Sequence, residues 1–179
     1  MCLSRRAVVV LATLAALPAL AGAENGPNLG VMVTPADISF WDISVGPDGV
    51  GLPPGAGTPS QGAVVYRAKC RSCHGENGSG QIADRLVGGF GTITGTMPAV
   101  KTVGSYWPYA TTFFDYVRRA MPLLEPQSLT SDEVYAVTAY ILNRNGIIGD
   151  RETMNAKTLP RVKMPNHDKF FRVYPGNLE

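Results

Sequence analysis

Cysteine and histidine are scarce in this sequence. The 179 residues include three cysteines and two histidines. Cys70 and Cys73 stand three positions apart, and His74 follows directly, so three of these five side chains fall in one short stretch. Two neighbouring cysteines would first suggest a single disulfide in an oxidising compartment. The histidine directly after Cys73 indicates a chemistry other than a disulfide, and the rest of the sequence is needed to identify it.

Charged side chains are also few, at 17% of the chain. If residues 1–23 are removed, Arg5 and Arg6 go with them, which leaves 14 basic and 14 acidic side chains. A formal net charge of zero argues against nucleic acid as a partner, because nucleic-acid binding needs a basic face. It also argues against strong long-range steering by net charge, although local charged patches stay open.

Long apolar runs are absent except at the start. Arg5 and Arg6 precede the uncharged stretch Ala7–Leu20, and Ala21-Gly22-Ala23 supplies the small residues of a cleavage site. We therefore predict a cleaved signal peptide over residues 1–23 and a periplasmic location. The run is short for a bilayer, and no later run is longer, so we expect no transmembrane anchor in the mature chain. A retained membrane anchor is the alternative.

The composition divides the remaining chain into three parts. Residues 24–60 are rich in glycine and proline and predict an extended arm, and residues 150–179 show no periodicity and predict an extended tail. Between them, residues 61–149 predict one domain.

Three helices are expected in that domain, around a long irregular loop over 75–109. The first spans 61–72 with Ser60 as its N-cap, and the second spans 111–121, where Pro122 stops it. The third begins at Thr130, which has capping-box spacing to Glu133, and ends at Asn145-Gly146. The fold class is therefore all-α. Three short helices bury little apolar surface, so a bulky apolar cofactor is expected to complete the core.

The sequence Cys-Arg-Ser-Cys-His from Cys70 to His74 is the signature of covalent haem attachment. Two cysteines on one helical turn can each form a thioether with one haem vinyl group, and the next residue then lies under the iron. We predict Cys70 and Cys73 as the covalent tethers of one haem c, and His74 as an axial ligand.

Three other chemistries could use the same residues. A redox-active disulfide requires a βαβ context, which is absent. A zinc site needs four ligands, and Cys73 and His74 are too close in sequence for good tetrahedral geometry. A structural disulfide across two residues would be strained.

The second axial ligand is expected to be a methionine. Met97, Met121 and Met164 each precede a proline. Met121 is favoured because it ends a helix 47 residues after His74, which lets the chain pass around the haem edge. Met97 lies in the glycine-rich loop and Met164 lies in the tail. His167 is a further alternative. Met121 could instead be an ordinary core methionine that fills a gap and does not bind the iron.

Aromatic and basic residues near Met121 are the remaining candidates. Tyr106 and Trp107, with Tyr109 beside them, could form a wall of the haem site or bond a propionate, or they could be ordinary core aromatics. Arg118 and Arg119 could neutralise propionates or face a partner, although a solvated helix face is the simpler reading. Gly75 is expected to leave room beside the ring.

These features resemble the class I c-type cytochromes over residues 60–148. In that family the first and last helices cross with a glycine and aromatics at the contact, and the residues here that match those positions are Gly62, Tyr66, Val137 and Tyr140.

A narrower resemblance comes from the segments around Met121, the arm segment WDISVGPDGVGLPPGAGT and the tail segment KMPNHDKF. These look like the cytochrome subunits that pair with molybdopterin sulfite or sulfane dehydrogenases in sulfur-oxidising bacteria. The resemblance implies a monohaem, non-catalytic subunit that accepts electrons from a molybdenum subunit and passes them to another cytochrome or an oxidase. A freely diffusing cytochrome shuttle is the main alternative. A haem enzyme with an open sixth site, acting on a sulfur compound or peroxide, is the third.

Overall fold

The computed structural model describes residues 30–94 and 98–170, so the predicted signal peptide, Met97 and Phe171 lie outside the described residues. The chain divides into two units, Met1–Ile38 and Ser39–Glu179, and the second holds the features discussed below. The helices, 3-10 turns and strands run in the order α2 (Pro35–Ser39), β1 (Ala56–Gly57), α3 (Pro59–Lys69), α4 (Arg71–His74), η1 (Glu76–Gly78), α5 (Ala110–Ala120), α6 (Ser131–Arg144), β2 (Met154–Asn155), η2 (Leu159–Arg161) and η3 (His167–Lys169).

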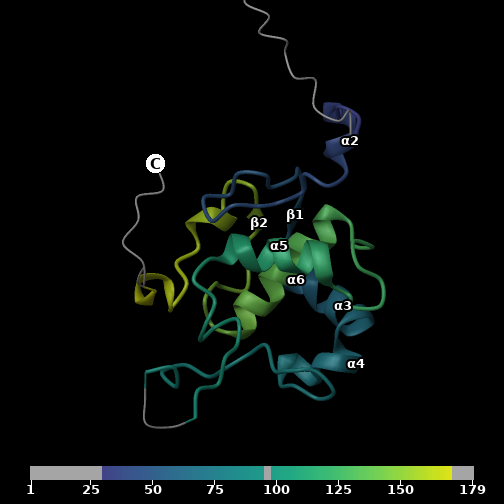
Figure 1. The fold of residues 1–179 in the computed structure, drawn as a ribbon. Helices are drawn as coiled ribbons and strands as arrows, with labels where there is room; N and C mark the ends of the chain where they lie inside the picture. The colour runs from purple at the N-terminus through teal and green to yellow at the C-terminus, as the bar shows by residue number, and fades with distance from the viewer. Residues whose placement is uncertain (1–29, 95–97, 171–179) are drawn as a thin grey trace, which may run out of the picture. The chain divides into compact units, whose positions relative to one another are not determined.

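Three main helices, α3, α5 and α6, are present as predicted, and Figure 1 shows them grouped together. The first begins earlier than expected. Its N-cap is Thr58 and not Ser60, because the Thr58 side chain accepts from Gln61 N–H while the Gln61 side chain accepts from the Thr58 backbone. Pro59 then occupies the first helical position, where its missing N–H costs nothing.

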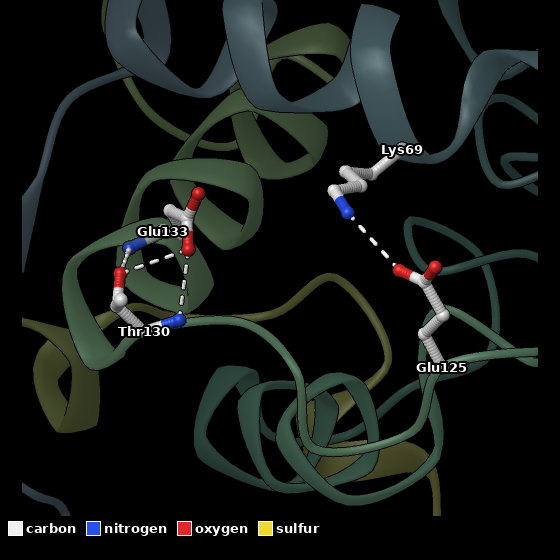
Figure 2. Close-up of polar contacts among 4 residues, drawn as sticks. All are labelled: Lys69, Glu125, Thr130 and Glu133. Carbon is white, nitrogen blue, oxygen red and sulfur yellow. Dashed lines mark hydrogen bonds and ion pairs between the residues drawn. The ribbon is translucent and has the colours of Figure 1, made fainter.

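The second and third helices match their predicted signals. Helix α5 ends at Ala120, with Met121 as its C-cap residue before Pro122. Helix α6 begins after Thr130, whose hydroxyl accepts from the Glu133 N–H at 3.3 Å. The Glu133 carboxylate accepts in return from the Thr130 N–H at 2.8 Å, and Figure 2 shows this reciprocal pair. The capping box therefore sets the start of the helix.

Helices α3 and α6 cross where α3 has a glycine. A Cβ on Gly62 would overlap the carbonyl of Ala136, so only glycine permits this approach. Next to it the Tyr66 and Tyr140 rings pack with centroids 5.0 Å apart, and Val137 is buried. Gly62, Tyr66 and Tyr140 thus meet at the crossing, as the family resemblance implied.

The predicted arm is packed on the helices over much of its described length. Val45 is buried, and its N–H donates to the Asp115 carboxylate on α5 at 2.9 Å. The Tyr135 hydroxyl on α6 donates to the carbonyl of Pro53 at 2.9 Å. Residues 45–57 of the predicted arm therefore lie on α5 and α6, because buried side chains of these helices form hydrogen bonds with this irregular backbone.

The predicted tail also docks. Strand β2 pairs antiparallel with β1, so arm and tail hydrogen-bond to each other, which adds a small sheet to the expected all-α fold. Met154, Leu159 and Met164 are each at most 2% exposed. Asn166 is buried and donates to the Tyr106 carbonyl at 2.8 Å. Apolar side chains without helical periodicity thus join the core because they meet α5 and α6 in space. In the described part of the chain, no helix is both long and apolar enough to cross a membrane.

Candidate functional site

The Cys-x-x-Cys-His motif forms one tight turn directly after α3. Helix α3 ends at Lys69, Cys70 departs from helical geometry, and α4 continues from Arg71 to His74. The N–H groups of Cys73 and His74 donate to the Cys70 carbonyl at 3.2 and 3.0 Å. One turn of backbone therefore carries both thiols and the imidazole, as the spacing predicted.

The His74 ring is held by a backbone carbonyl, which no sequence pattern indicates. Its Nδ1 lies 2.9 Å from the carbonyl oxygen of Asp84. A carbonyl only accepts, so Nδ1 carries the proton and Nε2 is left as the lone-pair nitrogen. In histidines that bind metals, a hydrogen bond of this kind to the other ring nitrogen fixes the tautomer and the orientation of the ring. The ring is therefore prepared to bind a metal through Nε2.

The two cysteines are free thiols in different surroundings. Cys70 is half-buried and Cys73 is exposed. Burial, followed by the neighbouring Cys73, raises the pKa of the Cys70 thiol to about 11. Within residues 30–94 and 98–170, no three His, Cys, Asp or Glu side chains gather in a group that could hold a metal ion.

Glycine is required directly after the motif. Gly75 has φ 76°, and a Cβ there would lie 2.5 Å from the carbonyl oxygen of Gly80. The buried Tyr66 hydroxyl donates to the Gly75 carbonyl at 2.9 Å. The Gly80 N–H donates to the His74 carbonyl at 2.8 Å, so the loop folds back under the motif. Gly75 therefore serves a tight turn, which refines the expectation that it only leaves room beside a ring.

The candidate sixth ligands differ in their surroundings. Met121 is half-buried at the end of α5 and packs on the core. Met164 is 1% exposed inside the core cluster. His167 is exposed, with its Nδ1 2.6 Å from the Asp168 carboxylate. Of the candidates in the described residues, Met121 combines a position at a helix end with a side chain that the core covers only in part, and it stays the prediction.

The aromatic candidates before α5 are connected to different neighbours. Trp107 is partly buried, and its ring lies 5.7 Å from both Phe113 and Tyr116 of α5. Tyr106 is 38% exposed and packs edge-to-face on Phe170 of the tail at 5.6 Å. Trp107 is thus anchored on the helix that leads to Met121, whereas Tyr106 is held by the tail. Their contact with a haem stays a prediction.

The two arginines of α5 have internal partners. Arg118 donates to the Ile43 carbonyl at 3.0 Å, and Arg119 pairs with the Asp115 carboxylate at 2.9 Å. A simple solvated face is therefore wrong for Arg118, which fastens the arm to α5. Both arginines are thus linked to the arm. Arg118 binds it directly, and Arg119 pairs with Asp115, whose carboxylate also accepts from the Val45 N–H.

One ion pair connects the end of α3, directly before the Cys-x-x-Cys-His motif, to the segment after Met121. Lys69 is the last residue of α3, and its Nζ lies 3.1 Å from the Glu125 carboxylate (Figure 2). Glu125 lies four residues beyond Met121 in the loop before α6. The sequence gives no signal for this pair, because 56 positions separate its partners and neither lies in a motif. It joins the two chain segments that carry the predicted ligands.

The comparisons with known proteins agree with this geometry. Residues 57–141 match the family described as cytochrome c oxidase, cbb3-type, subunit III. The chain also matches a chain in the crystal structure of the sulfane dehydrogenase SoxCD from Paracoccus pantotrophus, with 40% sequence identity and a TM-score of 0.76. That match covers 85% of this chain and 73% of the other. This chain belongs to the c-type cytochrome family. No curated protein sequence matched it.

The match to the SoxCD chain extends beyond the haem-motif domain of this cytochrome. The family match is confined to residues 57–141, whereas the structural match covers 85% of the chain. The structural match therefore includes residues on both sides of 57–141. As a c-type cytochrome, the protein is a haem-binding, electron-transfer protein.

Proposed function

We propose that this cytochrome is a periplasmic, monohaem class I subunit of a molybdenum-containing dehydrogenase that oxidises a sulfur compound. It would accept single electrons from the catalytic subunit and pass them to another cytochrome or an oxidase. The observation that carries the proposal is the 40% identity to a chain of SoxCD over 85% of this chain.

The residues of the motif suit one covalently held haem. Cys70 and Cys73 lie on one turn and are not joined in a disulfide, and His74 has its Nε2 lone pair free because Nδ1 is bound to the Asp84 carbonyl. A haem supplies a reversible one-electron change between Fe(III) and Fe(II). With His74 and Met121 as the two axial ligands, the protein would leave no position for a substrate, so outer-sphere electron transfer is the expected activity.

Exposed aromatic side chains on the arm and the tail support a fixed partner. Trp41 is 73% exposed, Phe40 is 66% exposed and Phe170 is 51% exposed. Phe40 and Trp41 pack edge-to-face at 5.3 Å and present one joint apolar surface. Neighbouring exposed aromatics of this size are characteristic of surfaces that a protein partner covers.

Co-purification tests the subunit proposal. The cytochrome should elute from gel filtration of native periplasmic extract together with a larger, molybdenum-containing protein, and the fractions should reduce its haem when a sulfur substrate is added. Elution near the mass of one mature chain would instead support the diffusing shuttle. A high-spin optical spectrum that shifts on addition of cyanide would support the enzyme with an open sixth site.

The haem itself is tested by mass. Mass spectrometry of the exported protein should give the polypeptide from which residues 1–23 are lost, plus one haem that acid-acetone extraction does not remove. The variants Cys70→Ala and Cys73→Ala should each weaken this attachment. A bare polypeptide mass from cells that mature other c-type cytochromes would contradict the proposed site.

A further inference from the structure

The side chain of Asn145 joins the end of α6 to a distant loop. Asn145 is the C-cap residue of α6 and is 5% exposed. Its Nδ2 donates to the carbonyls of Ile141 at 2.9 Å and Leu86 at 3.1 Å, and its Oδ1 accepts from the Gly88 N–H at 3.0 Å. A carbonyl only accepts and an N–H only donates, so these partners fix the orientation of the amide. The bond to Ile141 caps the helix, whereas the other two reach across 59 and 57 positions.

The end of α6 does not itself require these two bonds. Gly146 has φ 67°, the left-handed conformation that commonly ends a helix, and its N–H donates to the Asn143 carbonyl at 2.8 Å. The Asn145 amide is also packed tightly, since a Cβ on Gly104 would lie 2.2 Å from its Oδ1. A buried amide that is held this closely and directed at a loop indicates that the loop is what it serves.

The loop that α6 holds in this way carries the carbonyl that orients His74. Asp84, whose carbonyl oxygen lies 2.9 Å from His74 Nδ1, stands two residues before Leu86. On the other side of Asp84, the Ala83 N–H donates to the Cys73 carbonyl at 2.9 Å. Two residues of backbone span at most about 7 Å, so the position of Leu86 restricts where the Asp84 carbonyl can lie.

The other hydrogen bonds of this loop lead to irregular segments. Residues 83–88 form no helix or strand, and Asp84 itself is exposed. The Leu86 N–H donates to the Gly78 carbonyl at 2.8 Å, and the Thr102 hydroxyl donates to the Gly88 carbonyl at 2.6 Å. Both partners lie outside the main helices. The Asn145 side chain therefore gives the loop its link to α6, a helix that the crossing with α3 holds in place.

We propose that Asn145 is a positioning residue for the haem ligand His74. By holding Leu86 and Gly88, it keeps the Asp84 carbonyl within hydrogen-bond distance of Nδ1. The inference rests on the part of the proposed function in which His74 binds the haem iron. A hydrogen bond from Nδ1 leaves more electron density on a ligating imidazole, which favours Fe(III) over Fe(II). Asn145 thus lowers the reduction potential of the haem although it does not touch the motif.

NMR spectroscopy and a redox titration of the complete, haem-loaded protein test the proposal. In the reduced form of N145A, the Nδ1 proton of His74 should exchange with water at least about tenfold faster than in the wild type, because the loop loses two buried hydrogen bonds and opens more often. The reduction potential of N145A should rise. The matched control N143A removes an amide from the same helix end, one that donates to the Ile148 carbonyl at 3.1 Å and the Asp150 carboxylate at 2.9 Å. It should keep the exchange rate and the potential of the wild type.

The variant N145D keeps the shape and the acceptor oxygen but loses both donated bonds, so it should show the same two changes, and it carries the test if N145A does not fold. Exchange as slow as in the wild type would overturn the positioning role. Fast exchange with an unchanged potential would overturn the effect on the haem, and equal changes in N143A would show only a general loosening of the helix end.

The haem ligation is judged separately, on the wild type. Its reduced form should show the strongly upfield-shifted ring signals of a histidine bound to haem iron. If these signals are missing, the haem ligation by His74 is wrong, and the inference fails with it. If they are present and the Asn145 variants change nothing, the ligation stands and the positioning role alone is wrong.

Discussion

Gly62 of α3 lies directly against the backbone carbonyl of Ala136 in α6. A Cβ on Gly62 would overlap that carbonyl and would lie 2.7 Å from the Cβ of Tyr140. Backbone is pressed against backbone at this point, so neither side can move away without displacing a helix. The position of α3 determines where the motif turn at Cys70 begins, and the packing of one glycine thereby locates the candidate site.

Replacement of Gly62 by alanine should therefore lower the free energy of unfolding by about 1–3 kcal/mol, the usual cost of overpacking a filled core. Chemical denaturation of the purified protein measures it. The control Ala68→Ser changes an exposed residue of the same helix and should stay within about 0.5 kcal/mol of the wild type. A Gly62→Ala protein as stable as the control would show that the helices can separate at little cost.

The variant Met121→Ala should keep its covalent haem, because Cys70 and Cys73 are untouched. It should lose the methionine-to-iron charge-transfer band of the oxidised form and have a lower reduction potential, since methionine ligation raises it. Optical spectroscopy and a redox titration measure the two effects. Met164→Leu, which nearly conserves the volume of a buried side chain, should keep the band. An unchanged spectrum in Met121→Ala would move the assignment to Met97 or Met164.

A double-mutant cycle on Lys69 and Glu125 should give a small coupling free energy, about 0.2–1 kcal/mol, because both side chains are exposed. The coupling should fall toward zero at about 1 M salt, where charges are screened within a few ångströms. Denaturation of K69A, E125A and K69A/E125A at low and high salt measures it. The local pair Arg71–Glu76, 3.5 Å apart, is the control for an ion pair that does not connect to the Met121 loop. A coupling that persists unchanged at high salt would contradict a simple exposed ion pair.

The stability of the protein should fall as the pH rises above about 10, the pKa of an unperturbed tyrosine. Burial raises the pKa of Tyr135 to about 12, with a smaller opposing effect of Arg118. Between these values the folded chain holds a proton that the unfolded chain has released, so this contribution is complete below pH 10 and is lost through pH 12.

The variant Tyr135→Phe lacks this proton and should show a weaker decline of the unfolding free energy between pH 10 and 12. Burial raises the pKa of Tyr66 to about 12 as well, so part of the decline should remain. Urea denaturation at several pH values measures the slopes. Identical slopes in the wild type and Tyr135→Phe would show that Tyr135 has no share in the decline.

Local sequence signals determined the motif turn and the main helices. Cys70, Cys73 and His74 are close in sequence, so their spacing alone places them on one turn. Thr130 and Glu133 form a capping box for the same reason. Such features depend on neighbours within a few positions, and a linear sequence displays them directly.

Only the tertiary structure decided what holds the site together. The Asp84 carbonyl that orients His74 is a backbone group, and every residue has one, so no residue type could indicate it. The docking of the arm depends on Asp115, which meets Val45 across 70 positions. Irregular segments without helical periodicity gave no sign that they would be buried. Their order comes from hydrogen bonds and packing to distant helices, which exist only once α3, α5 and α6 are assembled.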